Sequence, residues 1–194
     1  MSHGVLPGFL SALPLLLLGA CVPGGYFRAP LPMEGLGNEV GLGTEYHTTT
    51  DAFEGETGAG AQFWYLHSFD DTWSAGAMAF VETQGTSTWP GGGAVVRWMF
   101  YRKPLVRVGV EWEAGWAWTG MAVPTAFALN DDLWLTVTPS ARIGVDSFPL
   151  RLPVGIAGRI GKTWVLQGEV GYGCFNCLTQ PGQVTAGVSV AKRF

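Results

Sequence analysis

The chain has 194 residues, of which 29 are glycine, 13% are aromatic and only 13% are charged. Soluble globular domains carry a charge on about a quarter of their residues, so this composition is unusual for a protein surrounded by water. The formal net charge of -4 and the lack of a basic run in the sequence give no electrostatic footprint for nucleic acid, which is excluded as an expected partner. The length allows one sizeable domain.

Residues 1–20 are predicted to be a processing signal. The apolar stretch at 10–18 is too short to span a bilayer as a helix, which needs ~20 residues. It runs into L-G-A-C at 18–21, a pattern that resembles the lipobox of bacterial lipoproteins. The resemblance implies cleavage before Cys21, a diacylglycerol on its sulfur and, because Val22 rather than an aspartate follows, sorting to the outer membrane. An ordinary secretory peptide followed by a chance cysteine is the alternative.

Residues 21–37 are predicted to be a lipidated tether. Three prolines and four glycines occur between residues 22 and 37 without a regular period. Such a composition favours an extended segment that joins the lipid to the first strand. The folded domain is therefore expected over residues 38–194.

From residue 38 onward, alternation of apolar and polar residues predicts β-strands. The clearest case is 106–118, V-R-V-G-V-E-W-E-A-G-W-A-W. One alternate set contains only valine, tryptophan and alanine, and the other contains Arg107, Glu111 and Glu113. A strand with one such apolar face separates two different environments, and we interpret these as lipid outside and a polar barrel lumen inside.

Tight turns and longer connections alternate along the chain, as they do in an up-and-down barrel with short turns at one rim and longer loops at the other. The polar stretch 69–73 is a tight turn, whereas 48–59 and 85–92 are longer connections. The predicted strands are 38-47, 60-69, 73-84, 93-102, 105-118, 120-129, 133-145, 150-160, 164-173 and 182-194. The predicted fold class is all-β, an up-and-down antiparallel transmembrane β-barrel of about ten strands of roughly the length that crosses hydrocarbon. Eight strands are the alternative, because Pro124 disfavours a strand at 120–129.

Alternation alone does not say which face points outward. A soluble lipocalin-like barrel would place the same valines and tryptophans around an internal cavity. A membrane barrel is favoured because Trp73, Trp134 and Trp164 stand beside tight turns, as in an interfacial aromatic girdle. The terminal strand also ends in Phe194, which resembles the final aromatic residue that serves as the assembly signal of bacterial outer-membrane barrels. This resemblance implies membrane lipids and the outer-membrane barrel assembly machinery as partners.

In this orientation the lumen receives charged residues of both signs in nearly equal number. They are Glu39, Glu45, Arg97, Arg107, Glu111, Glu113, Arg142, Arg151, Arg159, Glu169 and Arg193. Charges in a narrow space persist only when they are paired or hydrated. We therefore expect a salt-bridged network that fills the barrel, and a narrow ion-conducting pore is the alternative.

Few residues that could carry catalysis remain after processing. His47 is expected at the loop end of the first strand and His67 near the turn rim, so the two cannot share a site. Each is expected to be a surface or interfacial histidine. We expect no enzyme activity, no cofactor and no metal site.

Cys174 and Cys177 form the motif C-F-N-C. With Cys21 lipidated, only these two remain, which favours a disulfide in an oxidising compartment. A zinc site would need two further ligands, and a redox role would need a thioredoxin-like context. We expect a disulfide that stiffens the last loop, which with the loop at 89–92 is a candidate contact surface.

The sequence thus predicts a lipid-anchored outer-membrane β-barrel with a filled lumen. Its predicted role is that of a structural or interaction component of an envelope complex, with another envelope protein as partner. Two alternatives remain open. One is an envelope enzyme of the small-barrel type that modifies lipid or peptide, and the other is a soluble lipocalin-like lipoprotein carrier.

Overall fold

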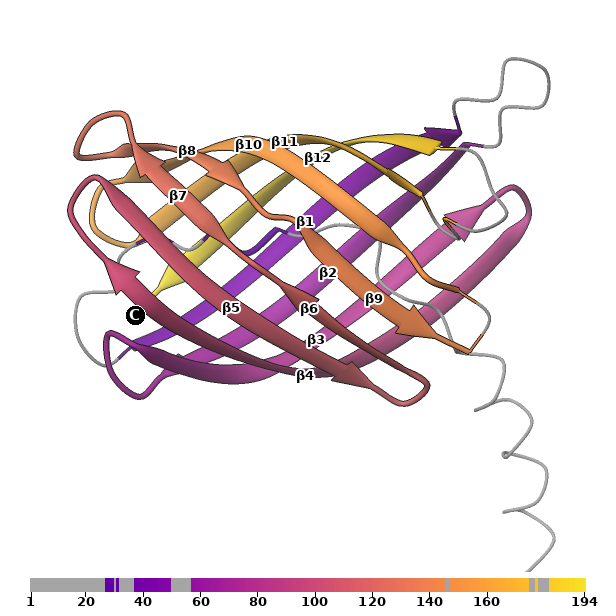
Figure 1. Ribbon diagram of the computed structural model, residues 1–194, viewed down its shortest axis with the longest axis horizontal. Coiled ribbons are helices and arrows are strands. Elements are labelled where there is room, and N and C mark those ends of the chain that lie inside the picture. Colours follow the sequence, from indigo (N-terminus) through magenta and orange to yellow (C-terminus); the bar gives the residue numbers. More distant parts are fainter. Residues whose placement is uncertain are drawn as a thin grey trace, which may run out of the picture.

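The computed structural model describes residues 27–29, 31, 37–49, 57–145, 147–174, 177 and 182–194 (Figure 1). Twelve strand segments form one antiparallel sheet. They are β1 (Gly37–Thr49), β2 (Thr57–Ser68), β3 (Trp73–Gln84), β4 (Ser87–Arg102), β5 (Val106–Gly115), β6 (Trp118–Ala122), β7 (Thr125–Ala128), β8 (Leu133–Val137), β9 (Ser140–Gly144), β10 (Leu150–Ile160), β11 (Trp164–Cys174) and β12 (Gly182–Arg193). Among these residues, no helix is long and apolar enough to cross a membrane.

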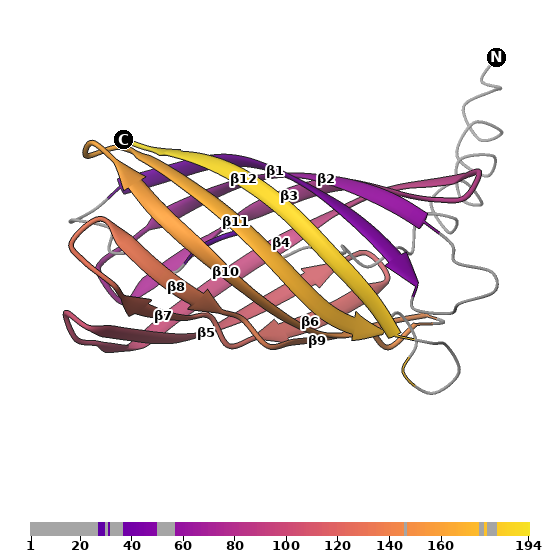
Figure 2. The same ribbon diagram turned by 90° about the horizontal axis from the view of Figure 1, so that it is seen from above.

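The sheet closes on itself into a barrel. Figure 2 shows β12 lying beside β1, and the two strands pair from Glu39 with Arg193 to Thr49 with Gln183. Asn38 and Phe194 exchange backbone hydrogen bonds of 2.8 and 3.0 Å at the end of this seam. Closure removes the sheet edges of the described barrel, and this is the condition under which a sheet can stand in hydrocarbon.

Prolines interrupt two of the strands without changing their course. β6 and β7 pair with β5 in one register on either side of Pro124. β8 and β9 pair with β10 in the same way on either side of Pro139. Each of these two pairs of segments is one interrupted strand, so the barrel has ten strands. The prediction of ten strands is confirmed and the alternative of eight is wrong, because a proline removes one ladder hydrogen bond but leaves the chain extended.

The hairpin between β3 and β4 is longer than predicted. Most of the expected loop at 85–92 belongs to β4, which begins at Ser87. Gly85 has a φ of 57°, a conformation that glycine adopts without strain and that permits a tight hairpin turn. The two strands therefore extend together beyond the others at this rim (Figure 1).

The outward face of the barrel is apolar. Leu42, Phe63, Trp112, Ile156 and Val188 are among its exposed large side chains. A continuous exposed apolar surface around a whole barrel is foreign to soluble proteins, whereas an apolar belt is the defining surface of outer-membrane barrels. The fold is that of a small outer-membrane β-barrel, and the soluble lipocalin-like alternative is wrong because the apolar faces of the strands point outward.

Aromatic side chains gather at the rim of tight turns. Trp73 and Trp98 stack there with ring centroids 5.6 Å apart, and Lys192 lies 5.5 Å from the ring of Trp164. Trp134 was predicted to join this girdle, but the structure buries it inside the barrel. Side chains alternate between the two faces of β8, and because Leu135 faces outward, its neighbour Trp134 faces inward.

The lumen is less polar than predicted. Trp64, Leu66, Phe80 and Trp118 are buried in it together with the charged residues. Trp118 was expected on the outward face of one strand at 106–118, but the chain reverses between Gly115 and Trp118. The alternation restarts after this turn, so Trp118 points inward and contacts Phe80 at 6.1 Å between ring centroids.

The outward apolar face predicts that a charge in the middle of it is costly. Leu42→Arg on β1 is expected to lower the free energy of unfolding by about 2–4 kcal/mol, because arginine would stand in hydrocarbon. Leu105→Arg, in a turn at the rim, is the control and is expected to cost about 0–1 kcal/mol. Denaturant unfolding of the protein in lipid vesicles, followed by tryptophan fluorescence, measures both. Two equal and small effects would contradict the lipid-facing orientation.

Candidate functional site

Five charged side chains meet in the centre of the lumen, and all are buried. Arg28 donates to Glu111 Oε1 from Nε at 2.9 Å and from Nη2 at 2.5 Å, and its Nη2 also contacts Glu113. Arg97 Nε donates to Glu111 Oε2 at 2.8 Å. Arg142 Nε donates to Glu113 Oε2 at 2.6 Å. Each carboxylate is therefore held by two guanidinium groups, an arrangement of strong charge-assisted hydrogen bonds.

Arg28 does not belong to the barrel wall. It comes from the predicted tether, 21–37, of which residues 27–29 and 31 lie buried inside the barrel. Arg97 Nη2 donates to the Arg28 carbonyl at 3.0 Å, and Ser189 Oγ donates to the Phe27 carbonyl at 3.1 Å. The sequence predicted a tether between the lipid and the first strand, and it did not indicate that residues 27–29 and 31 of this segment lie inside the barrel.

Glycines in the wall make room for bulky side chains in the lumen. The ring of Phe27 lies over Gly43 and Gly187, and the ring of Trp64 lies over Gly41. A β-carbon at each of these glycines would stand less than 3 Å from the ring above it. These positions therefore require glycine because of close approach, which is a common reason for glycine inside a strand.

A second charged cluster lies toward the turn rim. Glu39 accepts hydrogen bonds from Arg193 Nε at 2.8 Å and from Trp64 Nε1 at 2.9 Å. Arg107 is half-buried and lines a small cavity at the same rim together with Leu31. The sequence assigned these three charged residues to the lumen, and this is where the structure places them.

A third charged cluster lies toward the loop rim. Arg151 Nη1 donates to Glu45 Oε2 at 3.2 Å, and Gln167 Nε2 donates to Glu169 Oε2 at 2.9 Å. The sequence also assigned these charged residues to the lumen. His47 is buried beside Glu45 on the same face of β1, which corrects its expected surface or interfacial position.

Arg159, which the sequence also assigned to the lumen, binds a turn at the rim. Its Nε donates to Asp132 Oδ1 at 3.1 Å, and its Nη2 donates to the Asp131 carbonyl at 3.1 Å. Its guanidinium carbon lies 5.6 Å from the centre of the Trp134 ring. Arg159 is one residue from the end of β10, so its side chain reaches the turn between β7 and β8 at the rim of the lumen.

The two histidines lie at opposite rims, as expected. His47 pairs with Gly58 near the loop rim, whereas His67 pairs with Asn38 near the turn rim and its Nδ1 lies 2.9 Å from Asn38 Oδ1. They cannot act on one substrate group. Cys174 and Cys177 form the predicted disulfide, with Cα atoms 5.1 Å apart.

Three prolines on adjacent strands weaken one area of the wall. The carbonyl of each accepts a backbone hydrogen bond, but the proline has no N–H with which to return the second bond of its antiparallel pair. The donor–acceptor pairs are Gly109 to Pro124 at 3.0 Å, Val123 to Pro139 at 2.9 Å and Thr138 to Pro153 at 3.0 Å. The wall loses three ladder bonds at one height.

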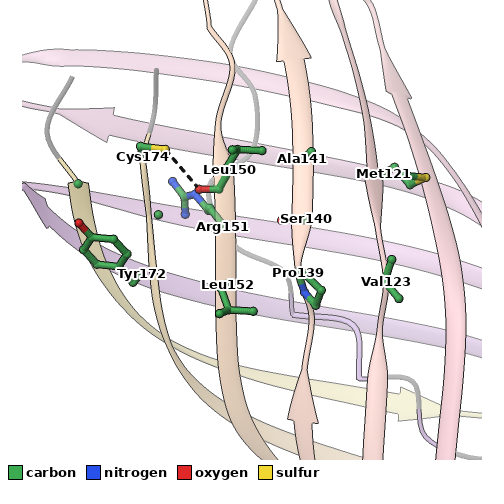
Figure 3. Close-up of a pocket in the computed structure, with 12 residues that line it drawn as sticks. Met121, Val123, Pro139, Ser140, Ala141, Leu150, Arg151, Leu152, Tyr172 and Cys174 are labelled. Atoms are coloured by element: carbon green, nitrogen blue, oxygen red, sulfur yellow. Dashed lines mark hydrogen bonds between the residues drawn. The ribbon is translucent and has the colours of Figure 1, made fainter. Parts of the chain in front are cut away.

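A groove of about 550 Å³ lies on the outer face at this weakened area. Figure 3 shows Val123, Pro139, Leu152 and Tyr172 lining it from neighbouring strands. Its lining is mostly apolar, and most of its lining side chains belong to the outward face of the barrel. The groove provides no cluster of polar groups arranged for chemistry.

Two lumen residues with an acidic or basic side chain, Arg28 and Glu82, were missed by the sequence analysis. Arg28 is a lone arginine among prolines and glycines, and no local pattern indicates that it enters the barrel. Glu82 shares the inward face of β3 with Met78 and Phe80. Because the opposite face of β3 is also apolar, alternation did not reveal which face was inside, although the two-residue spacing of these three would have grouped them.

Comparisons with known proteins give a likeness in overall fold. No protein-family model and no curated protein matches the chain. Among solved structures, Ail, the attachment invasion locus protein of Yersinia pestis, is 14% identical with a TM-score of 0.41, over 84% of this chain and 100% of that one. The KdgM porin is 12% identical with a TM-score of 0.46, over 83% and 99% of the two chains. The translocator domain of the autotransporter NalP from Neisseria meningitidis is 12% identical with a TM-score of 0.48, over 96% of each chain. Likenesses of this size carry no information about function.

The central network predicts a large effect for loss of one carboxylate. Glu113→Gln leaves Arg28 and Arg142 without their shared anion, and the free energy of unfolding is expected to fall by about 3–5 kcal/mol. Asp132→Asn, which breaks the exposed pair with Arg159, is the matched control and is expected to cost less than about 1 kcal/mol. Denaturant unfolding in vesicles compares the two variants. A Glu113→Gln variant as stable as the control would show that the Glu113 carboxylate stabilises the barrel no more than an exposed ion pair does.

Proposed function

We propose that this protein is a lipid-anchored barrel of the bacterial outer membrane that acts as a structural or interaction component of an envelope complex. The observation that carries the proposal is the occupied lumen. Phe27, Arg28 and Leu31 lie inside the barrel, and Arg28 is bonded to Glu111 and Glu113. A pore or a carrier needs free space inside, whereas a structural barrel needs none.

The lipid anchor in this proposal rests on the lipobox-like motif that ends at Cys21, outside the described residues. A lipid on Cys21 would add a second hold on the membrane to that of the barrel. The proposed contact surface is the loop rim, where the disulfide between Cys174 and Cys177 restricts the last loop. A stiff loop loses less conformational entropy when it binds a partner.

The occupied lumen predicts that the protein conducts ions poorly in a planar lipid bilayer. Replacing Phe27 and Arg28 together with alanine removes the ring over Gly43 and the bonds to the two glutamates, so single-channel conductance is expected to rise roughly tenfold or more. Arg159→Ala at the turn rim is the control and should conduct like the wild type. Ion conduction by the wild type at the level expected of the double variant would favour the pore alternative.

The interaction role predicts a discrete adduct when cells that carry the protein are treated with a crosslinker. The double variant Cys174→Ser, Cys177→Ser is expected to assemble normally, seen as faster gel migration without boiling, but to give several-fold less adduct because its last loop is no longer stiff.

Two controls make this experiment decisive. Labelled palmitate should appear on the wild type and not on Cys21→Ser, and an unlabelled wild type would refute the anchor. A wild type without any adduct would refute the interaction role. An unchanged yield in the double cysteine variant would place the contact away from the last loop.

A further inference from the structure

Three side chains with metal-binding atoms converge in the lumen near the loop rim. Glu45 and His47 extend from β1 and Glu82 extends from β3, and Figure 1 shows both strands ending at the rim opposite the C terminus. His47 Nδ1 lies 4.0 Å from Glu82 Oε2. One ligand atom from each of the three residues lies within 4.8 Å of the other two.

The strand β2 lies between β1 and β3, and it has glycine at the two positions over which the His47 and Glu82 side chains lie. On β2, Gly58 pairs with His47, and Gly60 pairs with Glu45 on one side and with Glu82 on the other. A β-carbon on Gly58 would stand 2.1 Å from His47 Nε2, and one on Gly60 would stand 3.1 Å from the Glu82 carboxylate. The imidazole and this carboxylate therefore lie directly over β2, in a space that any larger residue would fill.

Two of the converging atoms are buried and have no hydrogen-bond partner among the residues that the structure describes. They are Glu45 Oε1 and His47 Nδ1, in residues that are only 6% and 5% exposed. Such atoms are rare in folded proteins, because burial removes their water and nothing replaces it. Glu45 Oε2 is already held by Arg151 at 3.2 Å, which fixes the carboxylate and leaves Oε1 for another ligand. Ligands of metal ions are commonly oriented by partners of this kind.

The local charge favours a cation. Glu169 faces the lumen at the same height as Glu45, since both pair with Gly187 through β12. Glu45, Glu82 and Glu169 thus place three carboxylates in this part of the lumen, where Arg151 binds Glu45. A divalent ion would reduce the repulsion among the carboxylates in this buried place.

We propose that Glu45, His47 and Glu82 bind a divalent first-row transition-metal ion, for which Zn²⁺ is the probe. An imidazole nitrogen with two carboxylate oxygens suits such ions better than Mg²⁺ or Ca²⁺, which prefer oxygen alone. Zinc lies ~2.0–2.2 Å from such ligands, so the three side chains need to close in by about 1 Å or less. The ion would link β1 to β3 across β2. This site was not expected from the sequence, which predicted no metal.

The test is zinc titration of the full-length chain by isothermal titration calorimetry in detergent micelles. The protein carries Cys21→Ser, keeps its disulfide and is first stripped with a chelator. One zinc per chain is expected to bind. His47→Ala and Glu82→Gln are each expected to weaken binding roughly tenfold or more, because each removes one of three ligands. His67→Ala, the histidine at the opposite rim, is the matched control and should bind as the parent protein does.

Each variant is first shown to be folded by its faster gel migration without boiling, so that loss of binding is not loss of the barrel. Absence of zinc binding to the parent protein overturns the proposal, whichever variants fold. Binding that persists unchanged in folded His47→Ala or Glu82→Gln also overturns it, because the ion then lies elsewhere. An equal loss in His67→Ala would do the same.

Discussion

Closure of the sheet between β1 and β12 is the constraint on which the rest of the structure depends. Hydrocarbon offers no hydrogen bonds, so a strand can stand in it only when its backbone groups are paired on both sides. The seam from Glu39–Arg193 to Thr49–Gln183 completes this pairing, and the terminal residue Phe194 extends it to Asn38. Once the ring is closed, alternate residues must face either lipid or a narrow interior. Closure thereby brings the inward-facing charged residues of several strands together in one confined space.

The charges in that space stabilise the protein only as a set. Glu111 and Glu113 would each be costly alone inside the barrel, and they are tolerated because Arg97 reaches Glu111 from the adjacent β4 and Arg142 reaches Glu113 from β9, the next strand but one. Arg28 then adds a third cation, which the two carboxylates accept by sharing their oxygens. The segment around Arg28 is thus held by the wall's own network. The same carboxylates that make the centre of the barrel polar therefore also hold the segment that occupies the lumen.

Much of this could be predicted because alternation is local. Glu111 and Glu113 lie two residues apart on one face of a strand, and no tertiary information is needed to group them. Trp118 and Trp134 were misplaced because the alternation of inward and outward side chains starts afresh after a turn. The position of the turn depends on the neighbouring strands. Arg28 could not be placed at all, since its position depends on residues that are more than eighty positions away in sequence. Glu82 was hidden because both faces of β3 are apolar.

The high glycine content of the chain explains how bulky side chains fit inside the barrel. A narrow barrel with ten strands leaves little depth for side chains, yet Phe27, Trp64 and His47 all enter it. Each lies over a glycine of the wall, where a β-carbon would be closer than 3 Å. The shape of the lumen therefore depends on the wall glycines, which provide space, as much as on the bulky side chains that fill it. A glycine can also leave space for an ionisable side chain, as Gly58 does for His47, and the position of the glycine then determines which ionisable side chains can contact one another. Any change of these glycines is thus a change to the interior rather than to the strand alone.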